Sequence, residues 1–279
     1  MSSGETWGAA FASATTDSMR IYDAIMVPRI FDPWADLLLD TVGIAPGDRV
    51  LDVATGPGTV ARRAAARAGT SGQVTGCDLS PAMLEVATAK PPGAGAAPIT
   101  YLAGPAEALD VLDESFDVAL CQQGLQFFPD RPAALAEMRR ALRPGGRLGV
   151  AVWCTIEECP PFAALATACE PVLGAEVIDT FRHGPWGLPD PDELRRLVDG
   201  AGFTGVEVVR RTLPVVFEGG PAQMLATAGC AVIAPLIAAL DEQSRATLLA
   251  AATEALAPLM DGGGAIRSEL ASHVVTARR

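Results

Sequence analysis

Short apolar runs alternate with amphipathic stretches along the first half of this 279-residue chain. The runs are rich in Val, Leu and Ile and occupy residues 49–54, 73–78, 98–103, 116–121 and 147–153. Continuous hydrophobicity of this kind is typical of strands that are buried on both faces. Helical patterns lie between most of these runs, at residues 58–69, 80–90 and 130–146. The alternation predicts an α/β fold, a doubly wound parallel sheet with helices on both faces.

The second half of the chain follows a different pattern. Residues 154–187 are irregular to helical, and residues 190–203 predict a capped helix. A strand is predicted over 206–217, an Ala-rich helical region over 222–260 and a final strand over 272–279. These later elements are expected to complete the sheet and to cover one end of it.

Two stretches of unusual composition need an interpretation. LRPGG, residues 142–146, predicts the end of a helix, because Pro144 cannot continue one and the glycines permit a turn into the next strand. Residues 221–240 carry no charge and are long enough to suggest a membrane span. However, Gly229 and Pro235 interrupt this stretch and no basic residues flank it, so we expect a buried or interface helix pair. Its second half, 231–240, is also compatible with a homodimer interface.

The composition excludes several classes of protein. A net charge of −12 argues against nucleic-acid binding, which needs clustered Lys and Arg. Lys90 is the only lysine beside twenty arginines, which together with the abundant Ala, Gly and Pro favours a high-GC bacterial source. The six cysteines form no C-x-x-C pair, so we expect a reducing, cytoplasmic protein without disulfides or a metal site. The first thirteen residues include an acid and no base, unlike a signal peptide.

A glycine turn follows the first predicted strand. Residues 56–61, GPGTVA, fit the pattern G-x-G-x-x-A, in which glycines let the backbone approach a ligand and a helix follows. Asp78 closes the second strand, where a carboxylate accepts hydrogen bonds from ribose hydroxyls. Both NAD and S-adenosylmethionine contain an adenosine and fit this pattern. Asp52, four residues before Gly56, is expected to face the ammonium of S-adenosylmethionine and would repel the pyrophosphate of NAD.

Four segments in order resemble the successive motifs of class I S-adenosylmethionine-dependent methyltransferases. They are VLDVATGPGTVA, VTGCDLSPAMLEVA, AEALDVLDESFDVALCQQGLQFFPDR and LRPGGRLGVAVW. The sequence is most similar to the small-molecule group that includes ubiquinone/menaquinone C-methyltransferases. The resemblance is strong over residues 20–153 and looser over 189–203 and the terminal strand, 272–279. It implies a Rossmann-like sheet of seven strands with the last strand antiparallel, and a cofactor at the carboxyl ends of the first strands.

The resemblance also implies which residues bind S-adenosylmethionine. Gly56, Gly58 and the backbone of Ala54 would line its methionine part. Asp78 would bind the ribose hydroxyls, with Leu79 beside it. Two alternatives remain open from the residues alone: the glycines merely form a tight turn, or Asp78 caps the helix that starts at residue 80.

The adenine side is expected at the next two motifs. Met83 would lie against the adenine face, although a methionine on a helix is commonly a core residue. The backbone N–H of Ala106 would point toward a ring nitrogen. Pro105 stands where the group usually has an aspartate that accepts from the adenine amino group, and Glu107 is the candidate to replace it.

The acceptor side is less defined. Gln122 and Gln123 are expected near the transferred methyl group, or else they satisfy loop backbone. Tyr22 lies on an N-terminal segment that forms a lid in related enzymes, and it is expected to touch the cofactor. His183 is the candidate general base, although a loop histidine is also commonly structural or solvent-facing. Phe127 and Phe128 are expected in the core.

The sequence therefore predicts three parts within a single domain. Residues 1–45 would form the lid, 46–153 the cofactor-binding core, and 154–279 the rest of the sheet with helical insertions that cap the substrate. Trp186 and the uncharged stretch would make that cover apolar, which favours a hydrophobic or aromatic substrate of natural-product biosynthesis. The predicted activity is methyl transfer; the alternatives are a non-methylating reaction such as a cyclisation on the same fold, and a less favoured NAD-dependent oxidoreductase.

Overall fold

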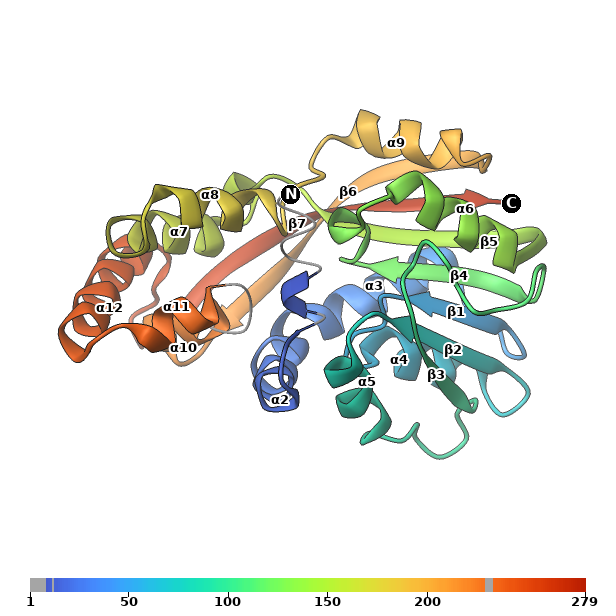
Figure 1. Ribbon diagram of the computed structural model, residues 1–279, viewed down its shortest axis with the longest axis horizontal. Helices are drawn as coiled ribbons and strands as arrows, with labels where there is room; N and C mark the ends of the chain where they lie inside the picture. Colours follow the sequence, from blue (N-terminus) through green and yellow to red (C-terminus); the bar gives the residue numbers. More distant parts are fainter. Residues whose placement is uncertain (1–8, 12, 229–232) are drawn as a thin grey trace.

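A seven-stranded sheet runs through the molecule and carries the helices on its two faces (Figure 1). The computed structural model describes residues 9–11, 13–228 and 233–279. The strands are β1 Arg49–Val53, β2 Gln73–Asp78, β3 Ile99–Ala103, β4 Phe116–Gln122, β5 Leu142–Trp153, β6 Thr204–Phe217 and β7 Ile266–Arg278, in the spatial order β3-β2-β1-β4-β5-β7-β6. β7 is antiparallel to both β5 and β6, whereas the pairs among β1 to β5 are parallel. The predicted sheet of seven strands with an antiparallel last strand is confirmed.

Helices cover the sheet and extend one end of it. They are α2 Thr16–Ile25, α3 Asp32–Val42, α4 Thr59–Ala68, α5 Pro81–Thr88, α6 Arg131–Ala141, α7 Pro160–Leu173, α8 Ala175–His183, α9 Pro191–Gly200, α10 Gly220–Ala228, α11 Ala234–Ala239 and α12 Glu242–Leu256. A π-helical turn, Val27–Phe31, joins α2 to α3, and short 3-10 turns occupy Leu125–Phe127, Ile156–Glu158 and Ala257–Leu259. α3 and α4 pack on one face of the sheet, and α6 and α9 on the other.

Successive residues of the central strands enter two separate hydrophobic clusters. In β1, Val50 packs in the cluster that includes α3 and α4, and Leu51 packs in the cluster that includes α6 and α9. Val118 and Ala119 of β4 divide in the same way, and every residue of β4 is buried. This confirms the prediction from continuous hydrophobicity, because neighbouring side chains of a strand point to opposite faces and both faces are covered here.

Strand β5 begins earlier than the sequence predicts. LRPGG does end α6 at Ala141, as predicted, but Leu142 is already extended and pairs with Phe116. The ladder then bulges before Arg147 pairs with Val118, and Gly145 adopts a φ of 79° within this bulge. The C-terminal residue is hydrogen-bonded to the same segment, so tertiary pairing recruits into the sheet a stretch that local sequence predicts as a turn.

Strands β6 and β7 form an arm that extends beyond the rest of the sheet. β5 pairs with β7 only as far as Trp153 opposite Ser272, whereas the β6–β7 ladder continues to Phe217 opposite Ile266. The extended arm carries a helical cap, defined here as α7, α8, α10, α11 and α12, at the left of Figure 1. Phe217 and Ile266 are fully buried within the same cluster as α3 and α4, so the cap shares the hydrophobic core of the sheet.

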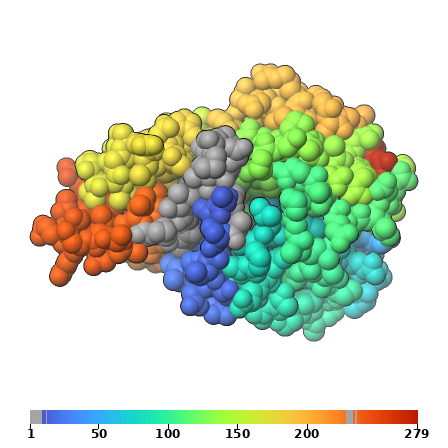
Figure 2. All heavy atoms as spheres, in the orientation of Figure 1, coloured from blue at the N-terminus to red at the C-terminus, as the bar shows by residue number. Residues whose placement is uncertain are grey.

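The N-terminal helix α2 is attached to the half of the sheet formed by β1, β2 and β3 through polar contacts with α5. Glu85 accepts hydrogen bonds from Thr16 Oγ1 at 2.7 Å and from Arg20 Nη2 at 3.3 Å. Asp23, which is buried, pairs with Lys90, the only lysine of the chain. In Figure 2 this N-terminal segment, in blue, lies between the cap and the half of the sheet formed by the first strands.

The uncharged stretch 221–240 contributes to α10 and α11. Over the described residues, no helix has both the length and the apolar character needed to cross a membrane. Three predictions fall wholly or partly outside those residues: the reading of the first thirteen residues, the state of Cys230, and the dimer interface at 231–240.

Gly149 of β5 tests how tightly the α3 face is packed. A Cβ added there would touch Val42 and would lie 3.0 Å from Leu120 Cδ2 and 3.3 Å from Leu38 Cδ1. We expect Gly149→Ala to lower the free energy of unfolding by about 1–3 kcal/mol through overpacking, measured by urea denaturation. Gly93→Ala is the matched control, because nothing lies within 4 Å of its added Cβ. Equal stability of the two variants would contradict the packing described here.

Candidate active site

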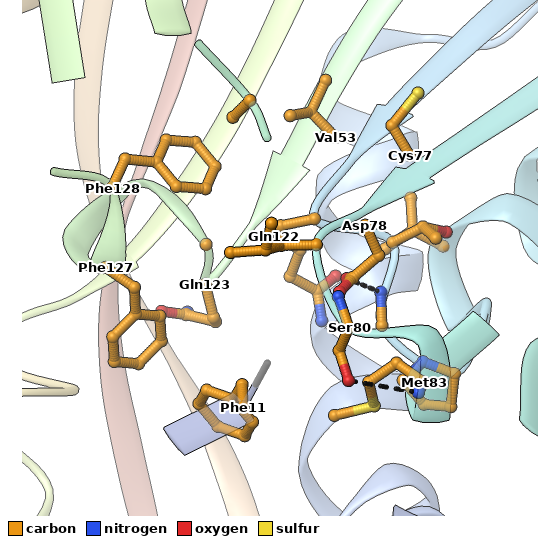
Figure 3. Close-up of a pocket in the computed structure, with 18 of the residues that line it drawn as sticks. Phe11, Val53, Cys77, Asp78, Ser80, Met83, Gln122, Gln123, Phe127 and Phe128 are labelled. Atoms are coloured by element: carbon orange, nitrogen blue, oxygen red, sulfur yellow. Dashed lines mark hydrogen bonds between the residues drawn. The ribbon is translucent and has the colours of Figure 1, made fainter. Parts of the chain in front are cut away.

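A cavity of about 400 Å³ opens at the carboxyl ends of β1, β2 and β4 (Figure 3). Its walls come from the glycine turn after β1, the loop between β2 and α5, residues 104–107, the end of β4 with the loop that follows, and the N-terminal segment. Ligand sites of open α/β sheets lie at this edge, and this volume is typical of a small-molecule pocket.

The turn after β1 requires left-handed backbone at three positions. Ala54, Gly56 and Gly58 have φ values of 58°, 54° and 79°. Gly58 begins α4, and a Cβ there would lie 3.1 Å from Ala87 Cβ and would also meet the hydroxyl of Tyr101. Glycine is therefore required at position 58 by both conformation and space. Ala54 holds the same conformation at a cost in strain, which is characteristic of ligand-binding loops.

Asp78 joins the two loops that form the floor of the cavity. Its Oδ2 accepts a hydrogen bond from the backbone N–H of Gly56 at 2.7 Å, and its Oδ1 accepts one from Ser80 at 2.8 Å. Burial raises the pKa of this carboxyl, and the two backbone donors oppose that shift. The side chain that caps α5 is Ser80, whose Oγ accepts from the backbone N–H of Met83, so Asp78 is free of the capping role.

Asp52 lies beneath the turn rather than on the cavity wall. It is 1% exposed, does not line the cavity, and accepts a hydrogen bond from Thr55 Oγ1 at 2.5 Å. Burial raises its pKa to about 7 although the Thr55 bond acts in the opposite direction. The structure therefore does not support the expected direct contact between Asp52 and a cofactor ammonium, because the side chain is enclosed by the turn that it supports.

The residues expected around adenine do gather at the cavity. Leu79, Met83, Pro105, Ala106 and Glu107 all line it. Met83 is 5% exposed and packs with the N-terminal helix, so it is a core residue and a wall residue at once. The particular contacts of these residues with adenine stay predictions.

Two glutamines at the end of β4 take different partners. Gln122 Nε2 donates to the backbone carbonyl of Phe31 at 3.0 Å, which ties the cavity to the π-helical turn of the N-terminal segment. Gln123 has a φ of 55°, and its Nε2 donates to Ser272 Oγ at 3.0 Å. Both glutamines line the cavity, as expected.

Phe127 and Phe128 lie on the wall of the cavity and are only partly buried, so the expectation that they are core residues is corrected. The 3-10 turn Leu125–Phe127 directs this loop back over the ends of the strands. Tyr22 lines the same cavity and stacks on Phe31, with ring centroids 5.3 Å apart.

His183 is outside the site. It ends α8, its side chain is 63% exposed, and its Nδ1 lies 3.0 Å from the carbonyl oxygen and 3.1 Å from a carboxylate oxygen of Asp179. It lines neither cavity of this region, so its position gives no support to a role as general base. The helix α8 directs it to the surface, whereas Phe181 and Trp186 close to it in sequence point inward. His273 is buried in β7 with Nε2 2.9 Å from the carbonyl of Pro189, as a structural histidine would be.

A second, smaller cavity of about 80 Å³ adjoins the first and lies between the N-terminal segment and the cap. The chain has nine Phe, four Trp and two Tyr residues, fourteen of them in the part that the structure describes. Eight of these fourteen aromatic residues line the second cavity: Phe11, Tyr22, Phe31, Phe127, Trp153, Phe162, Phe181 and Trp186. Five of the described residues line both cavities, namely Phe11, Tyr22, Phe31, Gln123 and Phe127. We refer to this second cavity as the aromatic chamber.

Sequence reasoning missed several residues of the chamber. Phe11, Gln126 and Thr227 come from three distant segments and line it together, and Ser272 lies behind it in β7. No spacing rule connects these positions. Gln126, Thr227 and Ser272 share one signal, a polar residue within an otherwise apolar stretch, and Phe11 has none.

Comparison with known proteins identifies the chain. A model of the ubiE/COQ5 methyltransferase family matches residues 8–218. The chain belongs to the ubiE/COQ5 methyltransferase family. An uncharacterized protein of Mycobacterium tuberculosis is 37% identical over 192 residues, 69% of this chain but 66% of that protein, just under two thirds of its length. The ubiquinone/menaquinone biosynthesis C-methyltransferase UbiE of Cupriavidus taiwanensis is 32% identical over 193 residues, 66% of this chain and 78% of that protein.

A solved structure supports the same fold. The phosphoethanolamine N-methyltransferase 2 of Haemonchus contortus, in complex with S-adenosyl-L-methionine, has a TM-score of 0.59 at 20% identity, over 95% of this chain and 57% of that one. Membership of the family confirms the predicted class, an S-adenosylmethionine-dependent methyltransferase, and its cofactor, and the solved structure supports the fold.

The charges of the larger cavity suit this cofactor. Among the described residues that line it, the only charged side chains are Asp78 and Glu107, and both are acids. A cationic sulfonium with an ammonium and ribose hydroxyls complements them, whereas the pyrophosphate of a dinucleotide would find no cation. The sequence analysis used the charge of Asp52 to favour S-adenosylmethionine over NAD. In the structure the same argument applies to Asp78 and Glu107, the acids that line the cavity.

Asp78 is the strongest test of the cofactor site. We expect Asp78→Ala to weaken the affinity for S-adenosylmethionine by about 1–3 kcal/mol, because charge-assisted bonds to the ribose would be lost. Calorimetric titration measures the dissociation constant, and Asp78→Asn, which keeps one acceptor for the loops, separates binding from folding. Asp199→Ala, an exposed change on α9, is the control. An unchanged dissociation constant in both Asp78 variants would count against this site.

Asp52 gives a prediction on pH. Between about pH 4 and about pH 7 the unfolded chain has released the Asp52 proton whereas the folded chain retains it, so folding is opposed increasingly as the pH rises. Asp52→Asn has no proton to release. The free energy of unfolding of the variant minus that of the wild type should rise across this window, by at most about 4 kcal/mol between pH 3 and pH 8. Urea denaturation over a pH series measures this difference, and a constant difference would show that Asp52 ionises normally.

Proposed function

We propose that this protein transfers a methyl group from S-adenosylmethionine to a hydrophobic or aromatic small molecule bound in the aromatic chamber, in natural-product biosynthesis. The observation that carries the proposal is the concentration of eight of the fourteen described aromatic residues around one cavity that adjoins the cofactor cavity. Flat apolar rings bury well against aromatic walls, which favour stacked or edge-on contacts.

The two cavities share one boundary, and that boundary suits methyl transfer. The cofactor supplies an electrophilic methyl group, so the protein needs to align the acceptor and exclude water. The residues that line both cavities are those able to do this: Phe11, Phe31 and Phe127 exclude water, and Tyr22 and Gln123 offer polar atoms for orientation. Tyr22 and Gln123 therefore remain the candidates for catalytic roles, and His183 does not.

Relatives lend support to a ring-shaped substrate. Those named UbiE are C-methyltransferases of ubiquinone and menaquinone biosynthesis. The proposal for this chain extends only to an apolar acceptor, whether carbon, oxygen or nitrogen. A cytoplasmic location is part of the same proposal, supported by the five described cysteines, all of which are free and buried.

The proposal is tested by titration followed by a product screen. S-adenosylmethionine and S-adenosylhomocysteine are expected to bind, and NAD is not. Incubation with aromatic and polyketide-like compounds should then give products heavier by about 14 Da, one CH₂ for each methyl group. Products of unchanged mass would favour a cyclisation or other rearrangement on this fold, and binding of NAD alone would overturn the cofactor assignment.

Substitutions of Phe162 and His183 compare a residue of the chamber wall with a residue of the surface. Phe162 lines only the chamber and packs against Trp186 with ring centroids 5.3 Å apart. We expect Phe162→Leu to raise the KM of the acceptor about 2–10-fold through loss of aromatic contact, with the cofactor dissociation constant unchanged. His183→Ala should leave both kcat and KM within about twofold, since a surface side chain contributes little. A large loss of kcat in His183→Ala would restore it as the base.

A further inference from the structure

Three polar side chains form a buried relay between the aromatic chamber and strand β7. Gln126 is 1% exposed, Ser272 is fully buried and Gln123 is 7% exposed. Gln126 and Gln123 line the chamber, and Ser272 lies behind them. Burial of such groups costs free energy unless each is hydrogen-bonded, so the partner of every atom in the relay is informative.

A backbone carbonyl sets the direction of the relay. Ser272 Oγ lies 2.6 Å from the carbonyl oxygen of Val152, which only accepts, so the hydroxyl donates its single proton there. Ser272 Oγ must then accept from the atom of Gln123 that faces it at 3.0 Å, and that atom is Nε2. The amide orientation of Gln123 is therefore determined by the Val152 carbonyl through one hydroxyl.

The same reasoning fixes the orientation of Gln126. With Nε2 of Gln123 toward Ser272, its Oε1 faces Gln126 and accepts from Nε2 of that residue at 3.4 Å. The Oε1 of Gln126 is then the free end of the relay. It is buried and has no hydrogen-bond partner among the described residues. The relay thus ends in an unpaired acceptor.

The surroundings of this acceptor restrict what can pair with it. Among the described residues that line the chamber, none is charged, and eight are aromatic. Over the described lining an anion would meet no cation, and a charged group of either sign would be desolvated without a counter-ion. A neutral O–H or N–H is the complementary group, because it supplies the missing donor without bringing a charge.

Building on the function proposed above, we infer that the chamber selects neutral aromatic substrates that carry an O–H or N–H donor, and that Gln126 is the specificity-determining residue. The donor pairs with Gln126 Oε1, while the aromatic side chains hold the ring. An aromatic compound that carries only acceptors, such as an aryl ether, leaves Gln126 Oε1 unpaired. Its own oxygen lone pairs then face those of Gln126 Oε1. The preference for a donor-bearing compound arises mainly because the other compound leaves a buried acceptor without a partner, and less from the strength of one hydrogen bond.

Two matched probes test this inference by binding alone. With the protein saturated in S-adenosylhomocysteine, the dissociation constants of 1-naphthol and 1-methoxynaphthalene are measured by fluorescence titration. The wild type is expected to bind 1-naphthol about tenfold more tightly. In Gln126→Leu this ratio should fall to about one, while the affinity for S-adenosylhomocysteine stays the same, since Gln126 does not line the cofactor cavity. Gln243→Leu, an exposed change on α12, should keep the tenfold ratio.

Ser272→Ala tests the direction of the relay separately. Ser272 lines neither cavity, and its removal frees the amide of Gln123, and through it that of Gln126, to turn over. The preference for 1-naphthol should therefore decline although the chamber keeps its lining. Equal binding of the two probes by the wild type, or an undiminished preference in Gln126→Leu or Ser272→Ala, would overturn the inference. Failure of the wild type to bind S-adenosylhomocysteine would instead contradict the proposed function.

Discussion

The antiparallel pairing of β7 between β5 and β6 is the constraint on which the rest of this structure depends. It places Ser272 beside Val152, within reach of Gln123 at the end of β4. The same strand continues past the end of β5 and, with β6, forms the arm that carries the cap. One ladder therefore positions Ser272 of the polar relay and the cap residues of the aromatic wall, Phe162 and Phe181.

The electrostatics of the two cavities are complementary to two different ligands. Among the described residues of the cofactor cavity, the charged side chains are all acidic, and they suit a cationic cofactor. The aromatic chamber is uncharged over its described lining. In the proposed function, a low-polarity chamber next to the sulfonium would strengthen the attraction of the cation for its acidic partners and would keep water away from the methyl group. The boundary between the cavities is where these environments meet.

Two residues of this site hold strained backbone conformations. Ala54 and Gln123 adopt left-handed conformations without being glycine, Ala54 directly after β1 and Gln123 directly after the neighbouring strand β4. Gly124 next to Gln123 leaves room for Ala54, since a Cβ there would lie 2.6 Å from Ala54 Cβ. The hydrogen bonds of Asp78 and the burial of β1 and β4 hold these turns in place.

The sequence by itself determined the sheet, the glycine turn and the position of Asp78, because these depend on local hydrophobicity and on residues near one another in the chain. Motif order was sufficient to predict the family as well. Only the tertiary structure decided that Asp52 is enclosed, that Phe127 and Phe128 are wall residues, and that His183 is at the surface. It alone assembled Phe11, Gln126, Thr227 and Ser272, since contacts across more than a hundred residues follow from strand pairing and packing, which no local pattern records.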